Sequence, residues 1–64
     1  MPSASGEPLR VLYVEDDPAL RGILSAILTS RKDLQVVATA ASPTEALAEA
    51  QRVDFDVALL DLAL

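Results

Sequence analysis

The stretch LRVLYVEDDP, residues 9–18, decides the fold. Its first six residues are mostly apolar, with β-branched and aromatic side chains, and this composition predicts a strand over residues 9–14. Asp17 and Pro18 then mark the start of a helix, because Asp caps free backbone N–H groups and Pro suits the first helical position. We therefore predict a strand that leads through a short acidic segment directly into a helix.

The next segments repeat this alternation. Apolar residues recur at helical spacing and predict one apolar stripe on a helix that ends near Ser30: Leu20, Ile23, Leu24, Ile27 and Leu28. Residues 34–40 predict a second strand. The segment 42–45 (SPTE) has the spacing of a capping box and predicts the start of a second helix.

The second helix is expected to end near Arg52. We assign its inner face to Ala46, Leu47 and Ala50. Residues 53–56 predict a turn, in which Asp54 and Asp56 are interpreted as turn residues, and residues 57–62 predict a third, buried strand.

The predicted order β-α-β-α-β indicates a parallel sheet with helical crossovers, because its strands are apolar on both faces. Right-handed crossovers allow a strand order of 1-2-3 or 2-1-3. The order 2-1-3 places the two helices on opposite faces of the sheet. Since both faces need cover, we expect 2-1-3.

Composition narrows the function. The chain has 64 residues, of which 52% are hydrophobic, so we expect one small packed domain, over residues 9–64, after a flexible tail at residues 1–8. The net charge of −5 disfavours binding of nucleic acid or of an anionic membrane. There is no cysteine, and residues 1–8 have no features of a signal peptide, so we expect a soluble, cytoplasmic protein.

Three carboxylates are the candidate functional residues. Ligands bind open α/β sheets beyond the carboxyl ends of the strands, where the winding direction reverses. In the order 2-1-3 this point lies between the strands that end in Glu15-Asp16 and in Asp61. Their crowded negative charges favour a bound cation, and ligands that are all oxygen predict Mg²⁺ or Mn²⁺.

A plainer interpretation stays open for each carboxylate. Glu15 and Asp16 could belong to an ordinary solvated loop, and Asp61 could be a strand-end aspartate that faces water. The Leu-Leu-Asp-Leu context of Asp61 favours a function, and a carboxylate beside Mg²⁺ can serve as the nucleophile in phosphoryl transfer. Tyr13 is expected in the core, and Arg21 at the surface or in a local ion pair.

Two segments together resemble the receiver domain of two-component response regulators. These are VLYVEDDP at residues 11–18 and DVALLDL at residues 56–62, and the resemblance covers residues 9–64. It implies the first half of a flavodoxin-like, CheY-like doubly wound fold, with the third strand at its end.

The resemblance also implies roles for single residues. Asp61 corresponds to the phosphoryl acceptor, Asp16 to a direct Mg²⁺ ligand and Glu15 to its partner in the acidic pocket, while the backbone carbonyl of Ala63 would also reach the metal. The implied phosphoryl donor is a histidine kinase or a histidine phosphotransfer protein. The family often carries DNA-binding output domains, which this segment does not contain.

The chain departs from the family pattern in length. The family's switch Ser/Thr and its phosphate-pairing Lys lie on later strands, so we expect these 64 residues alone not to be competent and not to be an enzyme. One alternative is a scaffold without phosphotransfer, which would self-associate through the open edge of the third strand. Another is part of an unrelated α/β enzyme with an acidic metal site.

Overall fold

The computed structural model describes residues 6–61. Its elements follow the predicted order β-α-β-α-β: β1 (Leu9–Glu15), α1 (Pro18–Thr29), β2 (Leu34–Ala40), α2 (Pro43–Arg52) and β3 (Val57–Asp61). β1 is one residue longer than predicted, and the predicted last residue of the third strand, Leu62, lies outside the described residues.

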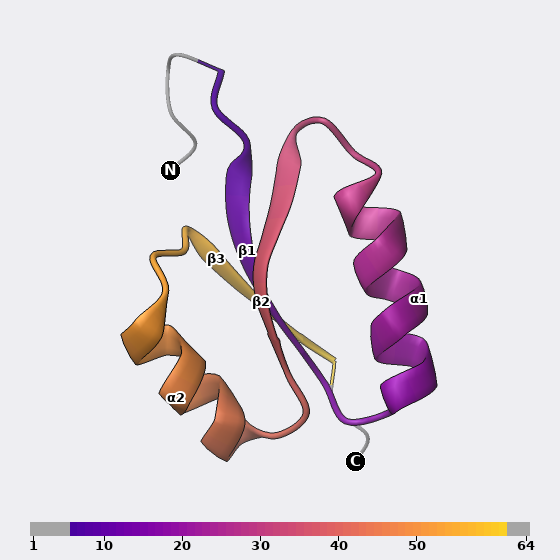
Figure 1. Cartoon of the computed structure of the whole chain (residues 1–64), viewed down its shortest axis with the longest axis vertical. Coiled ribbons are helices and arrows are strands. Elements are labelled where there is room, and N and C mark those ends of the chain that lie inside the picture. Colours follow the sequence, from indigo (N-terminus) through magenta and orange to yellow (C-terminus); the bar gives the residue numbers. More distant parts are fainter. Residues whose placement is uncertain (1–5, 62–64) are drawn as a thin grey trace.

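The three strands form one parallel sheet in the order β2-β1-β3, which confirms the predicted topology. α1 and α2 lie on opposite faces of this sheet, as Figure 1 shows. The pairing of β1 with β2 has an irregularity between Val11 and Leu12, where Val36 and then Ala38 are the partners on β2. In this order β1 is the central strand, with β2 on one side and β3 on the other, and β1 also carries the acidic segment at its end.

Both helices begin as predicted. The Asp17 carboxylate accepts hydrogen bonds from the N–H groups of Ala19 and Leu20 at 2.9 and 3.1 Å. Ser42 Oγ accepts the N–H of Glu45 at 3.2 Å, but the Glu45 carboxylate accepts the N–H of Ala41, at 2.7 Å, rather than that of Ser42. The second cap is thus a capping box displaced by one residue.

The core is centred on β1. Val11, Leu12, Tyr13 and Val14 are each at most 3% exposed. Successive side chains of a strand point to opposite faces, so β1 supplies apolar groups to both helices. On the α2 side, Leu12 and Val14 pack with several smaller or partly buried residues: Ala38, Ala40, Ala46, Ala50 and Phe55.

Burial of the helices differs from the prediction. Leu20, Ile23 and Ile27 are 38%, 58% and 53% exposed, so only Leu24 and Leu28 of the predicted stripe are turned far enough towards the sheet to be partly buried. Leu47 is on the sheet-facing side of α2, as predicted, since it lines a groove together with Leu12 and Val14, but its side chain is 67% exposed. Spacing predicted the apolar sides of the helices but not how much of each the sheet covers.

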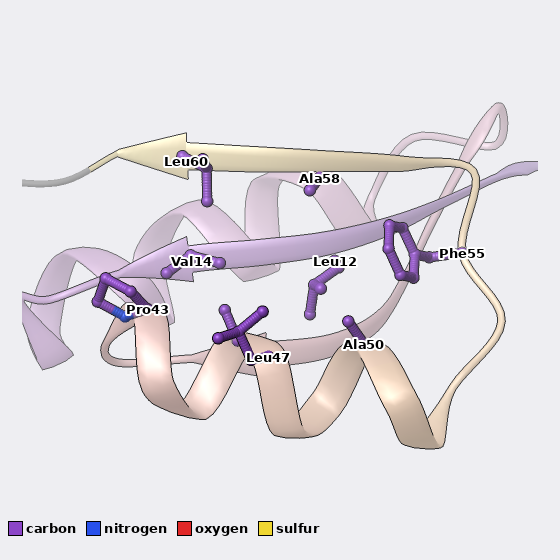
Figure 2. Close-up of a pocket in the computed structure, with 9 residues that line it drawn as sticks. Leu12, Val14, Pro43, Leu47, Ala50, Phe55, Ala58 and Leu60 are labelled. Atoms are coloured by element: carbon purple, nitrogen blue, oxygen red, sulfur yellow. The ribbon is translucent and has the colours of Figure 1, made fainter.

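β3 is exposed along its whole length, so the prediction of a buried third strand was wrong. Within residues 6–61 it contacts β1 and neither helix. An apolar groove with a volume of about 360 Å³ lies between β3 and α2. Figure 2 shows Leu60 and Ala58 of β3 on one side of this groove and Leu47 of α2 on the other.

The ends of the chain bear on two further expectations. Residues 6–8 form no regular structure before β1, whereas residues 1–5 lie outside the described part, so the flexible tail stays a prediction. No helix within residues 6–61 is both long and apolar enough to cross a membrane.

Candidate acidic site at the carboxyl end of the sheet

The pairing of β1 with β3 brings two of the predicted site residues together. Glu15 and Asp61 are partners in the parallel register, each as the last residue of its strand. Neighbouring strands are about 4.8 Å apart, and paired residues of parallel strands direct their side chains to the same face. Two carboxylates from distant parts of the sequence therefore share one edge of the sheet.

Glu15 is a buried carboxylate held by donors of its own segment. It is 3% exposed. Its Oε2 accepts the backbone N–H of Asp17 at 3.2 Å, and its Oε1 lies 3.5 Å from the Tyr13 hydroxyl, which donates to it. A buried carboxylate with two donors has a defined orientation, since each oxygen is tied to a different group.

The surroundings of Glu15 disfavour its negative charge. The N–H of Asp17 lowers the pKa of Glu15, but burial and the neighbouring carboxyl groups of Asp16 and Asp61 outweigh it, so that the pKa lies above its ordinary value. Burial, followed by the charges of Glu15 and Asp61, also raises the pKa of Tyr13. Neighbouring carboxyl groups contribute to both shifts after burial, and a cation bound here would offset their repulsion.

Asp16 and Asp61 are exposed. Ala63, the predicted carbonyl ligand, lies outside the described residues. In the described part of the chain, no three acidic side chains are grouped closely enough to hold a metal ion. The Glu15 carboxylate is instead turned to Tyr13 and Asp17, so the predicted three-carboxylate site stays a prediction.

The donor set nevertheless fits Mg²⁺. Within the described residues the candidate ligands are all carboxylate oxygens, two of them accessible, and burial and the carboxyl groups of Asp16 and Asp61 raise the pKa of the buried one, Glu15. Mg²⁺ prefers hard oxygen ligands and is commonly bound by one or two carboxylates together with waters.

Sequence reasoning missed the role of Arg21. Arg21 was predicted at the surface or in a local ion pair, but it is partly buried and forms no ion pair within residues 6–61. Its guanidinium Nη1 instead donates to the backbone carbonyl of Glu15 at 2.8 Å. Its position one helical turn after the cap residue Asp17 was the available signal. Tyr13 is in the core as predicted, but its hydrogen bond to Glu15 was not foreseen.

A second contact holds β3 beside β1 at the opposite end of the pair. Asp56 Oδ2 accepts the backbone N–H of Arg10 at 2.8 Å, while Asp56 Oδ1 lies 3.2 Å from the Arg10 guanidinium. The backbone N–H of Asp56 in turn donates to the carbonyl of Arg10 at 2.8 Å. Asp56 is therefore more than a turn residue, because it fixes where β3 begins.

Residues 11–64 match the family model of the response regulator receiver domain. The chain belongs to this family. The match begins within β1, includes every later element and both acidic segments, and confirms the resemblance of the sequence. Membership implies phosphoacceptor signalling in a two-component system, and receivers typically use Mg²⁺ and a histidine kinase.

The similar curated proteins include protein-glutamate methylesterase/protein-glutamine glutaminase 1 of Paramagnetospirillum magneticum, 35% identical over 98% of this chain. The proteins of the same type from Rhizobium etli and Agrobacterium fabrum are 37% and 38% identical over 89% and 86% of the chain. In each case the match spans 16% of the relative's length. No solved structure matches the chain significantly.

Proposed function

We propose that this chain is the phosphoacceptor part of a receiver in a two-component phosphorelay, with Asp61 as the residue that takes the phosphoryl group. The observation that carries the proposal is the parallel pairing of Glu15 with Asp61 at the carboxyl end of the sheet. Asp61 is exposed, as a nucleophile that meets a donor protein must be. In the transfer, an Asp61 carboxylate oxygen bonds to phosphorus as the bond from phosphorus to the donor histidine nitrogen breaks.

Mg²⁺ would be held by Asp16 and Asp61, with Glu15 beside them and the Ala63 carbonyl as a further ligand. When bound, the ion neutralises charge on the phosphoryl oxygens and on the carboxylates. The chain's own contribution is positioning: Glu15 is fixed by Tyr13 and Asp17, and Asp61 is fixed by pairing with β1.

We further propose that the donor is a histidine kinase or histidine phosphotransfer protein and that the chain acts in the cytoplasm. The activities in the relatives' names are not proposed for these residues, because the shared region is 16% of those proteins. The switch Ser/Thr and the Lys of the family are expected outside this segment, so the test uses the whole protein that carries it.

The test is phosphorylation of that whole protein by acetyl phosphate with Mg²⁺, measured by mass. We expect a mass increase of one phosphoryl group, lost in Asp61→Asn and kept in the matched variant Asp54→Asn, which removes an exposed aspartate of the turn before β3. Beryllofluoride with Mg²⁺ should shift NMR signals around Asp61. Phosphorylation that persists in Asp61→Asn would contradict the proposal.

The exposed third strand favours a second candidate, a scaffold that acts through pairing of β3. Leu59 and Leu60 are 44% and 62% exposed, and neither helix contacts β3 in the described residues. An exposed apolar edge strand is a template for pairing with another chain. Sedimentation distinguishes the two: a compact monomer at all accessible concentrations would exclude the scaffold function.

A further inference from the structure

Both peptide units that flank Asp16 are anchored by side chains. The carbonyl of the Glu15–Asp16 peptide accepts a hydrogen bond from Arg21 Nη1 at 2.8 Å. The N–H of the Asp16–Asp17 peptide donates to Glu15 Oε2 at 3.2 Å. Because a peptide unit is planar, fixing its oxygen or its hydrogen also fixes the Cα atoms at its two ends. Asp16 therefore has a backbone held on both sides, although its side chain is exposed.

Arg21 is itself held by the helix that it belongs to. The backbone N–H of Arg21 donates to the carbonyl of Asp17 at 2.8 Å, which is the first hydrogen bond of α1. Asp17 caps the same turn and has extended backbone angles, as expected of a residue before proline. The contact from Arg21 to Glu15 thus closes a small loop of chain, residues 15–21, that connects β1 rigidly to α1.

The partner of Arg21 sets it apart from the other arginines. Arg10, Arg31 and Arg52 each form an ion pair with a carboxylate. Arg21 instead donates to a main-chain carbonyl, at the edge of the sheet where Glu15 is paired with Asp61 and Asp16 follows Glu15. Its guanidinium leaves those carboxylates as acceptors for another cation.

We infer that Arg21 is a positioning residue for the acidic site: by holding the Glu15 carbonyl it directs Asp16 towards the metal position. This inference rests on the proposed function, since it assigns the orientation of the proposed direct Mg²⁺ ligand. Residues that orient metal ligands from outside the coordination sphere typically contribute 10- to 100-fold to metal affinity.

The direction in which Mg²⁺ affinity changes when Arg21 is replaced distinguishes a positioning role from an effect of its charge alone. Removing a positive charge beside a cation site strengthens cation binding when electrostatics alone operate. Loss of a positioning contact weakens it. Arg21→Met keeps a long, helix-compatible side chain without the donor, and Arg21→Lys keeps a donor and the charge.

The experiment measures Mg²⁺ affinity of the whole protein by calorimetry, together with the backbone amide signal of Asp16 by NMR. We expect Arg21→Met to weaken Mg²⁺ binding by about 10-fold and to change the Asp16 signal, with most of the affinity restored in Arg21→Lys. Arg31→Met is the matched control, since it removes one charge from an exposed ion pair and should leave the affinity unchanged.

Equal or tighter Mg²⁺ binding by a folded Arg21→Met variant would overturn the inference while leaving the proposed function intact. A wild-type protein that binds no Mg²⁺ would overturn both. If Arg21→Met does not fold, the guanidinium signals of Arg21 in the wild type decide. Slow exchange with water supports the contact with Glu15, and a freely rotating group contradicts the inference.

Discussion

At the scale of single residues, the most constrained position is Glu15, because it is a buried carboxylate with two carboxylate neighbours. Its pKa lies above the ordinary value of 4.5, which means that the folded chain disfavours the ionised form. Burial of a charge is tolerated only where something compensates it. The neighbouring carboxyl groups therefore repel one another, and a cation bound here would relieve this repulsion.

Glu15→Gln tests this repulsion. Without divalent cations at neutral pH, we expect the variant to have a higher thermal unfolding midpoint than the wild type, because one of the crowded negative charges is gone while the side chain keeps an acceptor for Asp17. With millimolar Mg²⁺, the wild type should gain more stability than the variant. Thermal unfolding followed by circular dichroism, in chelator and in Mg²⁺, measures both. A variant less stable than wild type in chelator would contradict this account.

The contact of Asp56 with Arg10 predicts how the stability of the protein depends on pH. The hydrogen bond from the Arg10 guanidinium, followed by that from the Arg10 backbone N–H, lowers the pKa of Asp56 below its ordinary value of 3.8. A lowered pKa in the folded state means that the stabilisation is present above the unfolded value and is lost as the pH falls through the folded one. We expect the thermal unfolding midpoint of the wild type to fall as the pH is lowered below about 4. In Asp56→Asn, the midpoint should depend less on pH over this range.

The matched control for Asp56 is Asp33. The pKa of Asp33 is also lowered, by its hydrogen bond with Arg31, but that ion pair joins neighbouring residues of one exposed turn. Asp56 instead joins the start of β3 to β1. We therefore expect Asp56→Asn to lower the midpoint at neutral pH more than Asp33→Asn does; equal effects would show that the link to β1 adds nothing.

At the scale of elements, the helices and strands follow local chemistry closely. The caps Asp17 and Ser42, each followed by proline, mark helix starts that the structure confirms. Their contacts lie within a few residues along the chain, so they can be predicted without knowledge of the fold. The strand order could also be predicted, because a sheet with two apolar faces requires a helix on each face.

Burial and long-range contacts could not be predicted in the same way. Whether Leu47 or β3 is covered depends on which element packs over it, and periodicity carries no such information. The contact of Arg21 with a carbonyl needs the end of β1 and the first turn of α1 in their final arrangement. Pairing of Glu15 with Asp61 was the exception, because strand ends and topology together were enough to predict it.

Burial also predicts how two leucines in the same groove differ. Leu12 of β1 is 2% exposed and Leu47 of α2 is 67% exposed. Truncating a buried leucine to alanine costs about 2–5 kcal/mol, whereas an exposed one on a helix costs little, since alanine is the better helix former. We expect Leu12→Ala to unfold much of the protein and Leu47→Ala to unfold at nearly the wild-type denaturant midpoint. A large loss in Leu47→Ala would show that something covers the groove.

At the scale of the whole molecule, charge and exposed apolar surface act against each other. The chain carries a net charge of −5, which opposes the approach of a second copy. The sheet has two edges, but α1 and α2 both pack on β2, whereas β3 has neither helix beside it in the described part of the chain. Self-association, where it occurs, should therefore use β3.

Salt makes this association testable, because screening removes the repulsion and leaves the apolar contact. The Debye length falls from about 10 Å at 0.1 M salt to about 3 Å at 1 M. For the 64-residue chain we expect a monomer in low salt and a larger sedimenting species in high salt. Leu60→Lys places a charge on the exposed strand and should abolish the larger species, even though it lowers the net negative charge that opposes association. Ala48→Lys makes the same charge change on the exposed surface of α2 and should leave association unchanged. If both variants associate like the wild type, then β3 is not the contact surface, and the scaffold function loses the observation that favours it.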